Sequence, residues 1–167
     1  MKRRDDPESE PESRSVHKLG IVDALAQLSF VVQGALARVA TEHDLSLVQT
    51  RLLGALRDRS PGMNELARHL ELDKSSVTGL VDRAEQRGFV RRKASAADRR
   101  AIEVSITAAG RKLAHRVEAE FEQRVVSLVR ILTATERAEL SELASRIVVE
   151  DARENGIELT DMFPEKR

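Results

Sequence analysis

Short polar and cationic side chains gather on one face of the segment that follows Asp73. This face carries Lys74, Ser75, Ser76, Thr78, Gly79, Asp82 and Arg83. The opposite face carries Val77, Leu80, Val81 and Ala84 at i, i+3, i+4 and i+7, which is the spacing of a buried helical stripe. Small side chains let a helix approach the floor of the DNA major groove, while Lys and Arg reach base edges and phosphates. The pattern predicts a groove-reading helix, although an ordinary helical hairpin with a solvated outer face shares it.

A second cationic cluster, Asp98-Arg99-Arg100, lies between two expected strands, Phe89–Lys93 and Ala101–Thr107. In the second strand Ile102, Val104 and Ile106 alternate with Glu103 and Ser105, so we expect the apolar set to face the core. The connecting loop is too long for a tight hairpin and is cationic at its end. Such a wing can place an arginine in the adjacent minor groove, and Asp98 is spaced to orient Arg100 by an ion pair.

The elements that position these clusters follow from periodicity and capping signals. A two-turn helix Met63–Leu70, a break at Glu71-Leu72, and a helix capped by Asp73 that runs to about Arg87 form a helix-turn-helix. Further helices are expected on both sides of this motif: Val16–Thr41, Leu47–Arg59 capped by Ser46, and Ala108–Ile131 capped by Thr107. A last helix is expected to begin at Thr133 or Thr135, with the apolar stripe Leu140, Leu143, Ile147 and Val148. Apolar stripes on helices outside a small complete domain favour pairing with a second chain.

Composition excludes several classes of function. The 167 residues contain no Cys, which removes disulfides, thiolate metal sites and thiol redox chemistry. Trp and Tyr are absent, so base-stacking platforms for single strands are not expected. The sequence is not expected to contain an apolar run comparable to a membrane span or a secretory signal. We therefore predict a cytoplasmic protein. Lys+Arg and Asp+Glu are both 28, yet residues 74–112 hold 10 basic and 4 acidic side chains, a local charge of +6 that suits a polyanion.

The sequence resembles the MarR (multiple-antibiotic-resistance regulator) family of winged helix-turn-helix transcription factors over Val16 to Arg153. The resemblance is carried by Asn64-Glu65-Leu66-Ala67, by Lys74–Thr78 with Leu80–Arg83, by Arg87–Val90, and by Asp98-Arg99-Arg100 followed by Val104–Arg111. It implies a mainly α fold with a small β-hairpin wing and the order α1-α2-α3-α4-β-wing-β-α5-α6. It also implies a cytoplasmic homodimer that represses transcription at a pseudo-palindromic operator and is released by a small phenolic or amphipathic effector.

On this resemblance the chain divides into a disordered arm (1–15), a dimerisation helix (16–44), a DNA-binding domain (45–107), C-terminal dimerisation helices (108–153) and a tail (154–167). Recognition-helix positions match Lys74, Ser75, Ser76, Thr78, Gly79 and Arg83. The wing positions match Arg100 and Arg99, with Asp98 as orienting partner, and Asn64 is placed to hold a backbone phosphate. The family's ligand pockets correspond to parts of Leu25–Val39, Leu45–Leu56 and Gly110–Phe121, where the polar candidates are Gln33, Arg38, His43, Gln49, Arg51 and His115.

Other functions stay open at this point. The peroxide-sensing branch of the family needs a reactive Cys, which this chain lacks, and its four His show no HxxH or HxH pair, so no metal or cofactor is expected. A metal-responsive regulator and a regulator without a ligand remain alternatives. An enzyme is disfavoured because no Gly-rich phosphate loop, HExxH or GxSxG occurs. A winged helix used for protein interaction is disfavoured by the basic middle of the chain.

The wing assignment predicts that Arg100→Ala weakens operator binding by about 1–3 kcal/mol, because the substitution removes a minor-groove arginine. The variant should remain a dimer, which sedimentation velocity can verify, and the affinity is measured by fluorescence anisotropy. Operator binding indistinguishable from that of the wild type would refute the assignment.

Overall fold

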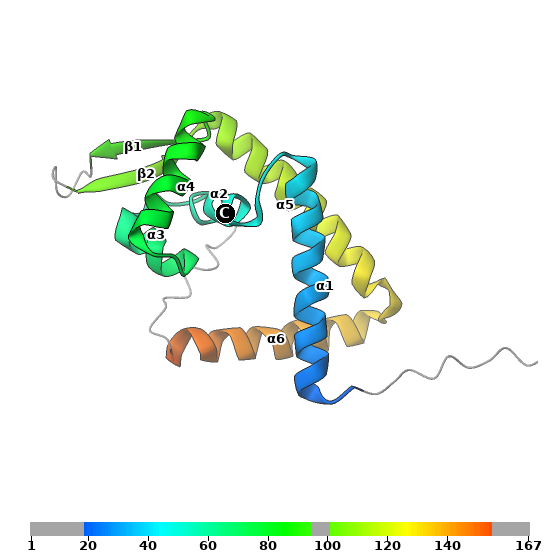
Figure 1. Cartoon of the computed structure of the whole chain (residues 1–167). Helices are drawn as coiled ribbons and strands as arrows, with labels where there is room; N and C mark the ends of the chain where they lie inside the picture. The colour runs from blue at the N-terminus through cyan, green and yellow to red at the C-terminus, as the bar shows by residue number, and fades with distance from the viewer. Residues whose placement is uncertain (1–18, 95–100, 155–167) are drawn as a thin grey trace, which may run out of the picture.

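The structure is a computed structural model that describes residues 19–94 and 101–154 (Figure 1). Its elements in chain order are α1 (Ile21–Glu42), α2 (Leu47–Ala55), α3 (Met63–Leu70), α4 (Lys74–Gln86), β1 (Val90–Ala94), β2 (Ile102–Ile106), α5 (Ala108–Leu128), the 3-10 turn η1 (Val129–Ile131) and α6 (Ala134–Glu154). The expected mainly α fold with a β-hairpin is confirmed. The second helix ends at Ala55 rather than Arg59, and the fifth ends at Leu128 and continues as the 3-10 turn.

The helix starts follow local capping chemistry. Ser46 accepts a hydrogen bond from the backbone N–H of Gln49, whose side chain accepts one from the Ser46 N–H, which completes a capping box. Asp73 caps α4 through the Ser76 N–H, and Thr107 caps α5 through the Gly110 N–H, both as predicted. For α6 the structure selects Thr133, which forms a reciprocal cap with Glu136. These caps place the helix boundaries that set the geometry of the site.

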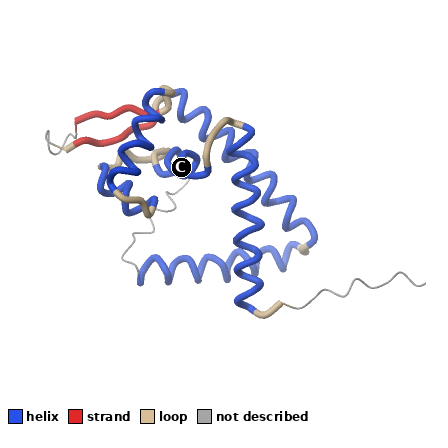
Figure 2. The backbone as a smooth tube through the Cα atoms, in the orientation of Figure 1, coloured by secondary structure: helices blue, strands red, loops and turns tan. Residues whose placement is uncertain are grey.

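One core joins the helix-turn-helix to the hairpin and to the long helices. It contains the C-terminal end of α1, most of α2, the inner faces of α3 and α4, the base of the hairpin and the first turns of α5. The predicted inner face of α4 (Val77, Leu80, Val81 and Ala84) is entirely buried. Strands β1 and β2 pair antiparallel with Val90 opposite Ile106 and Ala94 opposite Ile102. Figure 2 shows this hairpin extending from the helical lobe beside α4.

The second strand departs from the simple alternation expected of it. Val104 and Ile106 are buried, but Ile102 is 50% exposed because it lies toward the end of the hairpin farther from the core. Ser105, expected on the open face, is 7% exposed, and its hydroxyl accepts a hydrogen bond from Nε of Arg91. The predicted apolar face is therefore wrong at Ile102, and the predicted solvent face is wrong at Ser105.

The long helices leave apolar surface open to solvent. On α1, Leu25, Leu28, Phe30 and Val31 are exposed, and on α6 the exposed apolar residues include Leu140, Leu143 and Ile147. In the view of Figure 1, α6 passes behind the N-terminal half of α1 and ends below the helix-turn-helix lobe. By length and composition α1 is also long and apolar enough to cross a membrane, so the expectation of no apolar run comparable to a membrane span is wrong for this helix. Its Val39 and Ala40, however, are part of the core.

A close backbone approach joins α5 to the hairpin at Gly110. A Cβ added at Gly110 would lie 2.1 Å from the carbonyl oxygen of Phe89, the residue just before β1. At the same junction the Thr107 hydroxyl donates to the carbonyls of Gly88 and Phe89 while it accepts from the Gly110 N–H. The first turn of α5 is thus fixed against the start of the hairpin by contacts that only glycine permits.

We expect Gly110→Ala to destabilise the fold by about 1–3 kcal/mol, because the neighbouring backbone must move to accommodate the methyl group. The matched control is Gly54→Ala in α2, where an added Cβ meets nothing within 4 Å. The control should keep or raise the free energy of unfolding, since alanine favours a helix over glycine by up to about 1 kcal/mol. Both are measured by denaturant titration, and equal effects of the two substitutions would contradict the close approach.

Candidate nucleic-acid interface

The outer face of α4 is open and polar over its whole length. Lys74, Ser75, Ser76, Thr78 and Arg83 are exposed, Gly79 is half-buried, and the inner face is fixed in the core. Helix α3 leads into α4 through a tight turn in which Glu71 adopts a left-handed conformation (φ 55°) and the Leu72 N–H donates to the Ala67 carbonyl. Asn64 is exposed in the first turn of α3. The structure therefore presents the predicted helix-turn-helix side chains, Asn64 included, to solvent.

Asp73 organises the first turn of α4. Its carboxylate accepts hydrogen bonds from the hydroxyls of Ser75 and Ser76 and from the Ser76 backbone N–H. These bonds hold the pKa of Asp73 well below its usual range, with the Ser75 hydroxyl as the largest contribution. Both serine hydroxyls donate their hydrogen atoms to Asp73, so they can only accept hydrogen bonds from an incoming ligand. In this arrangement they accept from base amino groups more readily than they donate to phosphates.

Gly79 makes room for Arg83 on the surface of α4. A Cβ at Gly79 would lie 3.3 Å from a terminal nitrogen of Arg83, so the guanidinium folds back across the glycine. Thr78, beside it, donates its hydroxyl to the Lys74 carbonyl at 2.8 Å, which leaves its methyl group and an oxygen lone pair facing outward. The middle of α4 therefore carries only small side chains on its outer face, and the Arg83 guanidinium lies across them.

The hairpin adds cations that the sequence analysis did not single out. Arg91 is exposed and held to Ser105, while Arg92 bonds to Asp82 and Glu85 of α4. Lys93 lies 3.4 Å from Glu103. A basic run within a predicted wing strand was the signal that could have identified them. The predicted wing residues Asp98, Arg99 and Arg100 lie outside the described residues, so their roles stay predictions.

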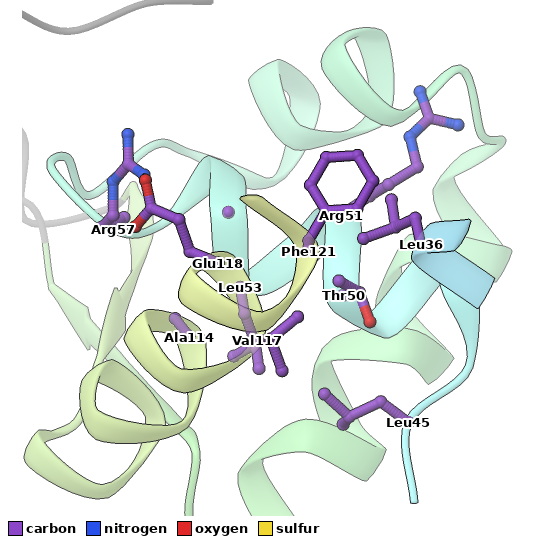
Figure 3. A pocket seen from close by; sticks show the side chains of 11 residues that line it. Leu36, Leu45, Thr50, Arg51, Leu53, Arg57, Ala114, Val117, Glu118 and Phe121 are labelled. Carbon is purple, nitrogen blue, oxygen red and sulfur yellow. The ribbon is translucent and has the colours of Figure 1, made fainter. Parts of the chain in front are cut away.

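A cavity of about 240 Å³ lies behind this interface, between α1, α2 and α5 (Figure 3). Its walls are mostly apolar, and its polar lining comes from Thr50, Arg51, Arg57 and Glu118. Figure 3 shows Arg57 and Glu118 together at one side and Phe121 with Leu36 at another. The guanidinium of Arg57 donates to Glu118 at 2.6 Å and to Asp58 at 2.7 Å, and these bonds, with the Asp58 bond first, raise the pKa of Arg57.

The structure separates the predicted ligand candidates. Arg51 lines the cavity, whereas Gln33, Arg38, His43, Gln49 and His115 do not. Gln49 is engaged in the cap of α2, His43 bonds to Glu120 at 3.0 Å, and His115 lies 3.7 Å from Glu118 on the outside of α5. Arg57 and Glu118 were missed because a pair 61 positions apart leaves no local pattern. Within the described part of the chain no group of three or more His, Asp or Glu could hold a metal ion.

The packing of Arg83 over Gly79 predicts opposite effects of Gly79→Ala on stability and on DNA binding. The added methyl favours the helix, so the free energy of unfolding should stay equal or rise by up to about 1 kcal/mol. It also displaces Arg83 and thickens the groove-facing surface, so DNA affinity should fall about tenfold, the lower end of the loss for one arginine–base contact. Calorimetry and anisotropy measure the two effects, and unchanged affinity would show that this surface does not meet DNA.

Comparisons with known proteins agree with this geometry. The model of the MarR family matches residues 43–101. The HTH-type transcriptional regulator PecS of Dickeya dadantii is 26% identical over 136 residues, which cover 79% of this chain and 82% of PecS. The HTH-type transcriptional repressor Rv2887 of Mycobacterium tuberculosis is 31% identical over 91 residues, 53% of this chain and 66% of Rv2887.

Solved structures show the same fold. The crystal structure of wild-type MarR from E. coli, in its apo form, aligns with a TM-score of 0.68 at 21% identity and covers 78% of this chain and 98% of that one. The structure of Rv2887 in complex with p-aminosalicylic acid aligns with a TM-score of 0.64 at 23% identity, over 77% of this chain and 98% of that one. The chain therefore has the winged-helix fold of these structures, and it is similar in sequence to the MarR family of DNA-binding transcriptional regulators over residues 43–101.

Proposed function

We propose that this regulator is a homodimeric, non-enzymatic repressor of the cytoplasm that binds a pseudo-palindromic operator and is released by an amphipathic small molecule. The observation that carries the proposal is the polar outer face of α4, fixed from behind by a fully buried inner face. A rigid helix with small side chains and a cation at each end meets the steric demands of the major groove.

The dimer is supported by the apolar surface that the single chain leaves open. Leu25 and Leu28 of α1 and Leu143 and Ile147 of α6 are each more than 40% exposed. Helices of this kind bury their stripes against a partner, and two-fold pairing is the commonest form among soluble homo-oligomers. Segments 16–44 and 108–153 would then form the dimer, and the lobe at 45–107 would read DNA. A two-fold dimer requires half-sites roughly 10 bp apart, one turn of the double helix.

In the proposed complex the first turn of α4 enters the major groove. Lys74 and Arg83 would reach base edges or phosphates, Ser75, Ser76 and Thr78 would contact bases over the low surface at Gly79, and Asn64 would bind a phosphate. Arg100, with Arg99 beside it and Asp98 as its partner, would enter the minor groove. The charge of +6 on residues 74–112 supports this arrangement over a protein-interaction role.

The experiment is a titration of purified protein against DNA upstream of its own gene and against a random duplex, at several salt concentrations. We expect tight, competitor-resistant binding whose log–log salt dependence is steep, because each neutralised phosphate contributes about 0.9 to the slope. A shallow slope, or equal binding to both duplexes at every salt concentration, would count against an operator-binding repressor. No binding of either duplex would favour a protein-interaction module.

Release by a ligand is supported by the cavity between α2 and α5, which adjoins the DNA-reading lobe and combines apolar walls with Arg51 and Arg57. Rv2887 was solved with p-aminosalicylic acid bound, an aromatic carboxylate of suitable polarity for such walls. An apolar ring with one anionic group fits the lining in size and charge. A small aromatic carboxylate is therefore the effector class we assign to this cavity.

Filling the cavity should abolish release without affecting DNA binding. Ala114 lines the cavity and Ala119 is exposed on the same helix. We expect p-aminosalicylate to dissociate the operator complexes of the wild type and of Ala119→Leu, and to leave that of Ala114→Leu intact. Anisotropy of labelled operator reports both binding and release. Release that is equally efficient from Ala114→Leu would place the effector elsewhere.

A further inference from the structure

In the described part of the hairpin, Arg92 on β1 bonds to α4. Its guanidinium donates to Oε2 of Glu85 at 2.6 Å and to Oδ1 of Asp82 at 2.6 Å. Its backbone N–H donates to the other oxygen of Glu85 at 2.9 Å. Asp82 and Glu85 are three residues apart, so both carboxylates lie on the side of α4 that faces the strand. Side chain and main chain of Arg92 thus bond to the same helix.

Arg92 and Glu85 both carry their charges at neutral pH. The Arg92 backbone N–H and then its guanidinium lower the pKa of Glu85, so this carboxylate stays ionised. Burial opposes the charged form of Arg92, but the bonds to Asp82 and Glu85 outweigh it and raise the pKa of Arg92. The Arg92 side chain is only 25% exposed, less than the Lys93 side chain at 46%. Charge-assisted, partly shielded bonds of this kind restrict motion more than exposed ion pairs do.

Within the described residues, the hairpin is anchored in the core at its base and is more exposed farther out. At its base Val90, Val104 and Ile106 enter the core, and the Val104 N–H donates to the Pro61 carbonyl. Farther out, Lys93, Ala94 and Ile102 are exposed. An isolated two-stranded hairpin is only marginally stable, so its direction depends on such side anchors. Arg92 lies midway along β1 and is the point where that strand bonds to α4.

We propose that Arg92 is a positioning residue for DNA binding, which holds the wing at a fixed distance and angle from the recognition helix. The inference rests on the proposed function, because major-groove and minor-groove contacts form together only if helix and wing are correctly spaced. If that spacing is already fixed in the free protein, less conformational entropy is lost when the protein binds DNA.

The spacing can be measured on the free protein. The chain has no Cys, so nitroxide labels can be placed specifically at Ala94→Cys on the hairpin and Gln86→Cys at the end of α4. Double electron–electron resonance on labelled chains diluted with unlabelled ones reports distances within one chain. We expect a narrow distribution with Arg92 present and a broad one in Arg92→Ala and in the isosteric pair Asp82→Asn with Glu85→Gln. The distance distribution of Arg92→Lys should be narrower than that of Arg92→Ala, and that of Lys93→Ala should stay as narrow as with Arg92 and Lys93 both present.

The second measurement is operator affinity as a function of salt. We expect Arg92→Ala to bind about tenfold more weakly, within the range for coupled contacts in one network, with the wild-type salt slope. A slope reduced by about 1 would identify Arg92 as a phosphate ligand instead and overturn the proposal.

A narrow spin-label distribution in Arg92→Ala, confirmed as folded by its unfolding transition, would also overturn it. Wild-type protein that binds no operator is a failure of the proposed function, whereas wild-type binding that Arg92→Ala retains in full is a failure of this inference alone.

Discussion

The contact on which the arrangement depends is the approach of α5 to the backbone of Phe89, which is possible because residue 110 has no side chain. It fixes where the hairpin begins, and the Thr107 hydroxyl donates to the carbonyls of Gly88 and Phe89 at the same place. From this junction α5 runs back along α2 and α1, where Arg124 pairs with Glu42 and His43 with Glu120. The hairpin and α5 are therefore joined rigidly at this point, and a shift of α5 would be transmitted to the hairpin and the end of α4.

That joint suggests how one chain couples three tasks. The open stripes on α1 and α6 suit a partner chain, the outer face of α4 suits DNA, and the cavity lies between these regions. Arg57 and Glu118, which connect the α2–α3 segment to α5, are part of the cavity wall. An anion bound beside Arg57 would compete with Glu118 and thereby loosen α5 from the helix-turn-helix. In the proposed dimer, a ligand in this cavity would act on the elements that set the spacing of the two recognition helices.

Much of this could be predicted from the sequence, and the successes have a common cause. Asp73, Ser46 and Thr107 act on residues within one turn, and the buried face of α4 repeats with the helical period, so short-range pattern was sufficient. What failed depends on residues far apart in sequence. Ser105 is buried by tertiary packing, and Arg57 bonds to Glu118 across 61 positions. Arg92 lies within an expected strand, but its partners Asp82 and Glu85 become visible only once that strand is placed beside α4.

Hydroxyl-radical footprinting of the full-length dimer on its operator tests the central claim most directly, because it reports where helix and wing lie on the DNA at nucleotide resolution. A two-fold symmetric pattern is predicted, with two protected half-sites centred roughly 10 bp apart and a separate minor-groove protection outside each. The outer protections should disappear in Arg100→Ala while the half-site protections remain. A single asymmetric footprint, or outer protections that do not depend on Arg100, would contradict the account.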